Sequence, residues 1–220
     1  MGLFVVMIGV QGAGKGTQAQ LLSEEFNIPH ISTGDLFRAM KTQDTPLARE
    51  VQALMAQGAL ISDEITNRMV EERLKEADAQ SGAIFDGYPR NVDQAAVLVN
   101  LLEKKDQKIA ATILMELDRD IAFKRAEGRR YSQDKSRVYN VYFNPPKVEG
   151  IDDVDGQPLF QREDDKPEAV NERIDTFYEV TMPIIPYYKS EGMRVVEINA
   201  DQSIDAVKND VFTAVNSVKA

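Results

Sequence analysis

The chain has 220 residues, 43% of them hydrophobic, which is enough for one large domain or for one domain that carries insertions. It has no cysteine, which excludes a disulfide framework, a thiolate metal site and a cysteine nucleophile. The formal net charge of −10 argues against a nucleic-acid-binding protein. No apolar run reaches membrane-spanning length and no signal-peptide pattern opens the chain, so we expect a cytoplasmic protein.

Strand-like and helix-like segments alternate along much of the sequence. The apolar run Leu3–Ile8 predicts a parallel strand buried on both faces, and Ala19, Leu22 and Phe26 predict a helix after it. Further strands are expected at 28–32, 82–86, 110–117 and 194–199, and a last helix carries Ile204, Val207, Val211, Val215 and Val218 on one face. This alternation predicts an α/β fold with a five-stranded parallel sheet flanked by helices.

Two stretches interrupt the alternation. Residues 33–61 read as two helices with no strand between them, and residues 128–165 are polar and rich in Pro, Gly, Tyr and Asp. A structureless loop of the second length is improbable in a compact domain unless it is functional or forms a small subdomain. We therefore expect a core formed by 1–31, 62–127 and 166–220, with insertions at 32–61 and 128–165.

The stretch GVQGAGKGTQ, from Gly9 to Gln18, predicts a phosphate-binding loop. It matches G-x-x-x-x-G-K between a strand and a helix, which is the context that this motif requires. Glycines let backbone N–H groups approach phosphate oxygens, the helix directs its positive end to the same place, and Lys15 adds a point charge. A tight turn without a ligand would not need four glycines and a lysine. The expected phosphate contacts are Gly12, Ala13, Gly14, Lys15, Gly16 and Thr17.

The stretch FDGYPRNVDQ predicts a second part of the same site. Asp86 ends an apolar strand, so its carboxylate should lie at the carboxyl edge of the sheet, where ligands bind in open α/β folds. A carboxylate there can hold Mg²⁺ through water molecules, although a turn cap is an alternative role. Gly87 permits a close approach, and Arg90 offers a planar fork for phosphate.

Helix caps and arginines complete the pattern. Ser32 or Thr33 is expected to cap a helix with Asp35 in its first turn, and Asp165 with Glu168 reads as a second capping box, with Pro167 in the first turn. His30, the only histidine, is assigned no role because a lone histidine at a strand end is more often structural. Arginines gather around the polar insertion, where a solvated face is the alternative to a phosphate site: Arg125, Arg129, Arg130, Arg137, Arg162 and Arg173.

Taken together, these motifs resemble a known family. In the phosphate loop, Gly16 stands where the general motif has Ser or Thr, and the hydroxyl follows at Thr17. This GxGKGTQ variant resembles the nucleoside monophosphate kinases, and the chain resembles an adenylate kinase over essentially its full length. Gln11 departs from that family, in which proline is common at this position, and the departure concerns the stiffness of the loop.

The resemblance implies an acceptor-nucleotide insertion at 32–61, a lid at 128–165 and a set of site residues. The implied AMP contacts are Thr33, Arg38, Ala59, Leu60, Ile61, Gly87, Tyr88, Pro89, Arg90, Gln94, Arg162 and Arg173. Besides the phosphate loop, the implied ATP contacts are Arg125, Arg129, Val138, Tyr139 and Gln202. The implied catalytic cations are Lys15, Arg90, Arg125, Arg129, Arg162 and Arg173, with Mg²⁺ at Asp86.

The expected function is therefore reversible, Mg²⁺-dependent phosphoryl transfer from ATP to AMP, giving two ADP, by a monomer that binds neither nucleic acid nor membrane. Three alternatives stay open: a pyrimidine nucleoside monophosphate kinase, a GTP:AMP phosphotransferase, and a non-catalytic P-loop regulator. Gln94 lies four residues after Arg90, where pyrimidine kinases tend to have Asn, and it can pair with an adenine edge.

In the lid, the resemblance aligns Ser132, Lys135, Asp152 and Asp155 with the zinc ligands of related kinases. No thiolate is present, and structural zinc favours Cys and His, so we expect no structural zinc. We expect Lys135 to face Asp152 or Asp155, with hydrogen bonds from Ser132 replacing the metal. Four unconnected surface residues are the alternative.

Overall fold

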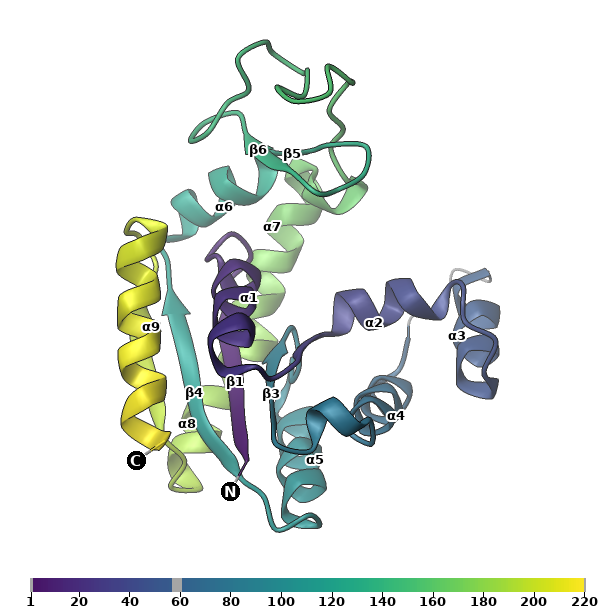
Figure 1. Ribbon diagram of the computed structural model, residues 1–220, viewed down its shortest axis with the longest axis vertical. Coiled ribbons are helices and arrows are strands. Elements are labelled where there is room, and N and C mark those ends of the chain that lie inside the picture. The colour runs from purple at the N-terminus through teal and green to yellow at the C-terminus, as the bar shows by residue number, and fades with distance from the viewer. Residues whose placement is uncertain (1, 57–60, 220) are drawn as a thin grey trace.

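The computed structural model describes residues 2–56 and 61–219, and its centre is a parallel sheet (Figure 1). The sheet has five strands in the order β2-β3-β1-β4-β7, all paired in parallel. Their bounds are Leu3–Gly9 for β1, His30–Ser32 for β2, Gly82–Asp86 for β3, Ile109–Glu116 for β4 and Val195–Asn199 for β7. The predicted fold class and the five predicted strands are confirmed, with bounds shifted by at most two residues.

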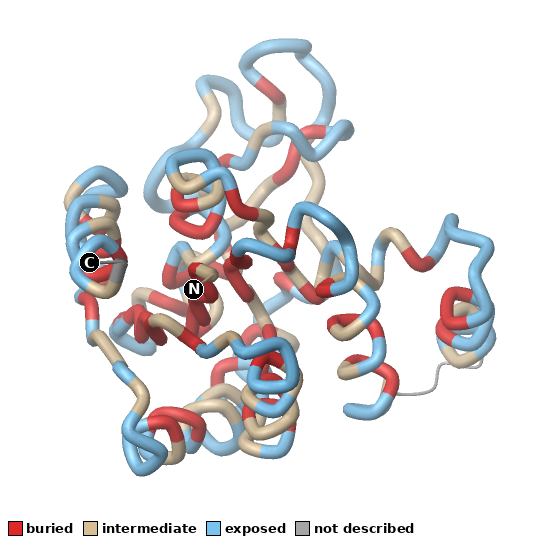
Figure 2. Tube along the Cα trace, turned by 60° about the horizontal axis from the view of Figure 1, so that its bottom comes forward, coloured by how far each residue is buried: buried red, intermediate tan, exposed pale blue. Residues whose placement is uncertain are grey.

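Helices cover both faces of the sheet because successive side chains of β1 point to opposite sides. Val5 and Met7 join a core cluster with α1 (Lys15–Phe26) and α9 (Ile204–Lys219). Phe4 and Val6 join a second cluster with α5 (Val92–Glu103) and α8 (Ile184–Ser190). The buried stretches lie in the interior of the molecule, and the loops and outer helix surfaces are exposed (Figure 2).

The first predicted insertion contains two helices, as expected. These are α2 (Thr33–Met40) and α3 (Pro46–Ala56), and α4 (Asp63–Arg73) follows them. The three helices share a third hydrophobic cluster, which includes Met40, Val51 and Met69 and is separate from the two clusters on the sheet. Ser32 is the cap of α2, because its Oγ accepts a hydrogen bond of 3.4 Å from the backbone N–H of Asp35.

The second predicted insertion, residues 128–165, is called the lid segment below. It follows α6 (Arg119–Glu127) and contains a small antiparallel hairpin of β5 (Arg129–Tyr131) and β6 (Val138–Asn140). In Figure 1 it stands beyond the end of the sheet toward which β4 points. It therefore forms a small folded unit on the side of the carboxyl ends of the strands.

The chain returns from the lid segment through a short 3-10 turn, η2 (Glu163–Asp165), into α7 (Pro167–Thr176). The predicted capping box of Asp165 and Glu168 is wrong. Lys166 is the N-cap residue of α7 and makes no side-chain cap, because Asp165 belongs to η2 and its carboxylate has other partners. Pro167 begins the helix as predicted.

The remaining elements are η1 (Ala77–Ala79) and a π-helical turn, η3 (Phe177–Thr181), that joins α7 to α8. None of the helices in the described part of the chain combines the length and apolar character needed to cross a membrane.

Candidate active site at the carboxyl ends of the strands

The phosphate loop leaves the carboxyl end of β1 and enters α1 at Lys15. Gly12 and Gly14 have φ values of 93° and 85°, in the left-handed region that glycine adopts without strain. At Gly12 a Cβ would also lie 2.7 Å from the carbonyl oxygen of Ala122 in α6. The loop therefore needs glycine at this position for both its conformation and its packing.

Lys15 folds back onto its own loop. Its Nζ donates hydrogen bonds to the carbonyl oxygens of Gly9 (2.7 Å) and Val10 (3.1 Å). Desolvation lowers the pKa of Lys15 to about 8, and the charges of Arg129, Arg173 and Arg90 act in the same direction against the attraction of Asp86. This concentration of positive charge is suited to an anionic ligand.

Asp86 ends β3 opposite Met7 of β1 and Ser32 of β2, as the sequence predicts. One of its carboxylate oxygens, Oδ2, lies 3.3 Å from Nε2 of His30. Burial alone would raise the pKa of Asp86, but the hydrogen bond with His30 and the charges of Lys15 and Arg90 hold it below the ordinary value. Asp86 is therefore an ionised carboxylate that faces the start of α1.

Thr33, Gly87 and Arg90 form the side of the site nearest the first predicted insertion, 32–61. The hydroxyl of Thr33 donates to the carbonyl oxygen of Gly87 (2.9 Å), and Nε of Arg90 donates to the same oxygen (2.9 Å). Gly87 has a φ of 72°, and a Cβ there would lie 3.0 Å from the Thr33 hydroxyl. Desolvation and the charge of Arg173 lower the pKa of Arg90, although much of its side chain stays accessible.

Gln94 is buried, and both ends of its amide are already engaged. Its Oε1 accepts from the backbone N–H of Arg90 (2.8 Å), and its Nε2 donates to Oδ1 of Asp63 (2.6 Å). Asp63 also accepts from Asn91 (2.7 Å). These bonds fix the direction of the amide and leave one N–H and one oxygen lone pair for another partner.

The other predicted acceptor residues are distributed around this region. Tyr88 is buried, donates from its hydroxyl to Asn67 (2.7 Å) and precedes Pro89 through a cis peptide bond. Arg38 forms an ion pair with Asp35 on the surface of α2. Ile61 lies just before α4, whereas Ala59 and Leu60 lie outside the described residues.

The predicted catalytic arginines do not all meet in the described structure. Arg90, Arg129 and Arg173 lie close enough to Lys15 to lower its pKa. Arg173 also pairs with Asp164 (2.7 Å). Arg162, in contrast, stacks on the ring of Tyr131 in the lid segment, with 4.0 Å from its guanidinium carbon to the ring centroid.

Arg125 lies on the side of the predicted donor base. It donates to the carbonyl oxygen of Ala200 (2.9 Å) and pairs with Asp201 (3.2 Å), next to Gln202. Gln202 is itself hydrogen-bonded to the carbonyl oxygen of Asn199 (2.8 Å). Two predicted donor contacts lie in the hairpin of the lid segment: Val138, which is exposed, and Tyr139, which is buried.

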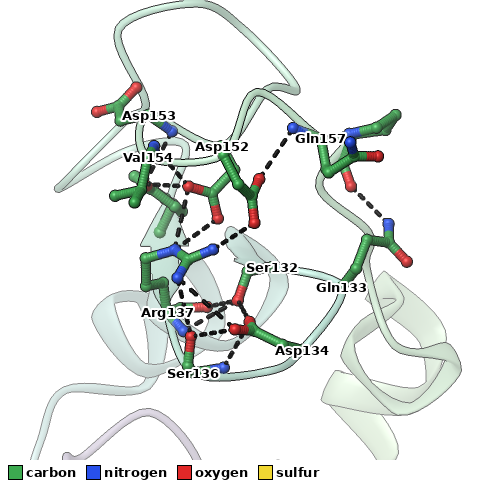
Figure 3. A network of polar contacts seen from close by, with 12 residues as sticks. Ser132, Gln133, Asp134, Ser136, Arg137, Asp152, Asp153, Val154 and Gln157 are labelled. Atoms are coloured by element: carbon green, nitrogen blue, oxygen red, sulfur yellow. Dashed lines mark hydrogen bonds and ion pairs between the residues drawn. The ribbon is translucent and has the colours of Figure 1, made fainter.

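A polar network centred on Arg137 connects the lid segment (Figure 3). Nε of Arg137 donates to Asp152 (2.8 Å to Oδ2), whose side chain is fully buried, and Nη2 donates to Asp155 (2.6 Å). Ser132 donates from its hydroxyl to Asp134 and accepts from the backbone N–H of Arg137 (3.0 Å). The hydrogen bonds of Ser132 stay within residues 132–137, so the prediction that they cross-link this turn to Asp152 or Asp155 is wrong. The link to those aspartates runs through Arg137.

The predicted partner of the aspartates, Lys135, is wrong. It makes no ion pair with any residue that the structure describes, and its φ of 61° places it in a tight turn closed by its N–H to the carbonyl oxygen of Ser132 (2.8 Å). Arg137 takes that role, and its planar fork reaches Asp152 through Nε and Asp155 through Nη2. The absence of structural zinc stays a prediction.

We expect Arg137→Ala to loosen the lid segment and Lys135→Ala to leave it intact. Removing Arg137 leaves the buried carboxylate of Asp152 without its cation, whereas Lys135 contributes no ion pair in the described structure. Amide hydrogen exchange should be at least about tenfold faster across residues 129–160 in the first variant. Equal protection in the two variants would contradict the central role of Arg137.

The sequence analysis gave no role to His30 or Asp63. It named Arg137 among the clustered arginines but did not place it at the centre of the lid network. His30 lies on β2, which pairs with β3, and its register with Ile84 puts it two positions before the partner of Asp86. The available signal for His30 was its place on a predicted strand that could pair with the strand ending in Asp86. No sequence signal marked Asp63, because its role depends on how α4 and α5 pack against each other.

Comparison with known proteins agrees with this geometry. A family model described as adenylate kinase matches residues 7–193. Adenylate kinase from Listeria innocua serovar 6a is 43% identical over 216 residues, which cover 98% of each chain. The adenylate kinases of Staphylococcus epidermidis and Limosilactobacillus reuteri are each 42% identical over 208 residues, which cover 94% of this chain and at least 95% of theirs. With the family model and such relatives matching along nearly its whole length, the chain belongs to the adenylate kinase family.

Proposed function

We propose that the chain catalyses reversible, Mg²⁺-dependent transfer of the γ-phosphoryl group of ATP to AMP, giving two molecules of ADP. The observation that carries the proposal is the convergence of Lys15, Arg90, Arg129 and Arg173 on a glycine-rich loop, opposite Asp86. Phosphoryl transfer needs little covalent chemistry from a protein. It needs in-line positioning and compensation of the phosphate charges, which these groups supply.

In this proposal ATP lies along the phosphate loop toward Arg125 and Gln202, and AMP lies toward Thr33, Arg90 and Gln94. The insertion at 32–61 binds AMP and the lid segment covers ATP. Arg162 lies on the ring of Tyr131 in the described structure, and in this proposal it moves to the phosphates when the lid segment closes. Closure also excludes water, which competes with AMP as the phosphoryl acceptor.

The donor groups near Asp86 fit Mg²⁺. The carboxylate is ionised and hard, and kinases bind Mg²⁺ through one or two carboxylates together with substrate phosphates and waters. When bound, the ion supplies charge neutralisation on the transferring phosphates. Asp86 would hold it through water, and His30 would orient the carboxylate through its contact with Oδ2. We also propose that the chain acts as a monomer in the cytoplasm.

The decisive experiment is a coupled assay for ADP with purified protein, Mg²⁺, ATP and AMP. We expect rapid ADP formation that depends on all three components. Omitting AMP is the matched control, because a nucleotide-binding regulator or a simple ATPase would behave alike with and without it. GTP in place of ATP separates an adenylate kinase from a GTP:AMP phosphotransferase.

We expect AMP to be preferred over CMP and UMP by at least about tenfold in kcat/KM, or about 1.4 kcal/mol. The side-chain amide of Gln94 keeps one N–H donor and one oxygen lone pair free. An adenine edge offers a matching nitrogen acceptor and amino donor. Gln94→Leu should lower the ratio of kcat/KM for AMP to that for CMP. The ratio is the readout because loss of the acceptor for the backbone N–H of Arg90 lowers both rates. Equal rates with AMP and CMP in the unmodified enzyme would contradict this assignment.

A further inference from the structure

Gln11 connects the phosphate loop to a residue 154 positions away. Its Nε2 donates a hydrogen bond of 2.9 Å to Oδ1 of Asp165. Asp165 ends η2 and has a relative exposure of 1%. A residue in the loop that should hold the donor phosphates is thus tied directly to the segment through which the chain leaves the lid.

Asp165 lies where the two ends of the lid segment meet. The side chain of Gln161 donates from Nε2 to the carbonyl oxygens of Glu127 (2.7 Å) and Asp165 (2.9 Å), which joins the entry of the lid segment to its exit. Arg129, the second residue of the lid segment, approaches the same Oδ1 atom of Asp165 at 3.7 Å. Gln11 and Arg129 therefore share one carboxylate oxygen.

The two contacts differ in kind. Gln11 is at hydrogen-bond distance, whereas 3.7 Å is an ion-pair distance that is too long for a hydrogen bond. A buried carboxylate without the glutamine donor would draw the guanidinium of Arg129 into a full hydrogen bond, which is a stronger contact. Arg129 is also near enough to Lys15 to lower its pKa, which places it beside the expected phosphates.

The contact is not optimised for stability. Oε1 of Gln11 and Oδ2 of Asp165 are both buried, and neither has a hydrogen-bond partner among the described residues. Burying polar groups costs free energy unless they are hydrogen-bonded, so a pair of apolar side chains of the same shape would be about as stable here. Burial also raises the pKa of Asp165, against the attraction of Arg129.

We propose that Gln11 is a positioning residue for phosphoryl transfer: by donating to Asp165 it leaves Arg129 available to the phosphates and holds the phosphate loop against the base of the lid segment. Gln11 does not itself touch the reacting atoms in this role. It acts through the carboxylate that would otherwise capture Arg129. The inference rests on the proposed function.

A double-mutant cycle with Gln11→Met and Asp165→Asn tests the proposal. Methionine keeps the length of glutamine without its donor, so kcat should fall by roughly tenfold while KM for AMP stays unchanged. In the Asp165→Asn background, where no carboxylate competes for Arg129, Gln11→Met should cause no further loss. Thermal unfolding of all variants separates these effects from loss of structure.

A second pair decides the outcome if Gln11→Met does not fold. Gln11→Glu keeps the shape and places a carboxylate against Asp165, so its kcat should fall further than that of Gln11→Met. Adding Asp165→Asn to Gln11→Glu restores the hydrogen bond between positions 11 and 165 with the direction reversed, because the asparagine amide now donates to the glutamate. This second change should recover most of the lost kcat.

Unchanged kcat in Gln11→Met, additive effects in the cycle, or no recovery in Gln11→Glu with Asp165→Asn would each overturn the role of Gln11. An unmodified enzyme that forms no ADP from ATP and AMP would instead overturn the proposed function. The two failures are therefore distinguishable.

Discussion

Replacing Lys15 with methionine should lower kcat for ADP formation by at least about 100-fold while the fold survives. A preorganised cation contributes most where charge develops in the transition state, and Lys15 contacts the carbonyl oxygens of the phosphate loop directly. Lys108→Met is the matched control, because Lys108 is exposed at the opposite end of the sheet, next to the first residue of β4. Near-normal turnover in Lys15→Met would refute the assigned site.

The same variant should gain stability without nucleotide, in a way that depends on pH. The pKa of Lys15 is about 8 in the folded chain and about 10.5 when unfolded, so the unfolded chain binds more protons between these values. Between about pH 8 and about pH 10.5, the free energy of unfolding of the unmodified protein therefore rises relative to that of a variant without the Lys15 amine. The Tm advantage of Lys15→Met should be greatest at about pH 7 and shrink at about pH 9.5.

Arg90→Ala should also lower kcat by about 100-fold, because Arg90 is the cation placed between the strand that ends in Asp86 and the acceptor side. Arg90→Lys keeps the charge but loses the planar fork, so it should retain more activity than alanine and less than arginine. Steady-state kinetics with ATP and AMP varied separately give the measurement.

Arg194→Ala is the control for a lost arginine outside the site, since Arg194 is exposed, precedes β7 and contacts Ser217. Equal kcat in Arg90→Ala and Arg194→Ala would contradict a role for Arg90 in transfer. The backbone N–H of Arg90 still binds Gln94 in either Arg90 variant, which limits indirect damage to the acceptor side.

The sequence predicts the sheet, the phosphate loop and Asp86 well because each depends on local patterns. A continuous apolar run, a glycine spacing and a carboxylate at a strand end are all readable within a few residues. The lid pairing was misassigned because Lys135 and Arg137 are two positions apart, and turn geometry alone decides which one meets Asp152.

The contacts of Asp165 could not be predicted from the sequence, for a different reason. The pattern before α7 suited a capping box, but the carboxylate accepts a hydrogen bond from Gln11, which lies 154 positions earlier in the chain. The local preference was overridden by packing between distant segments, for which a single sequence carries no spacing rule. His30 was missed in the same way, since only the pairing of β2 with β3 brings it to Asp86.

The lid segment is held by ion pairs and hydrogen bonds around Arg137, and large apolar side chains in it are exposed, among them Val138, Tyr142, Phe143, Val148 and Val154. Heat capacity changes follow the apolar surface exposed on unfolding, so disrupting this segment changes the heat capacity little. Unfolding the core exposes two large apolar clusters, so it changes the heat capacity much more. On cooling, the hydrophobic stabilisation of the core weakens, whereas the ion pairs and hydrogen bonds of the lid segment do not depend on that effect, so the two parts of one chain should respond differently to temperature.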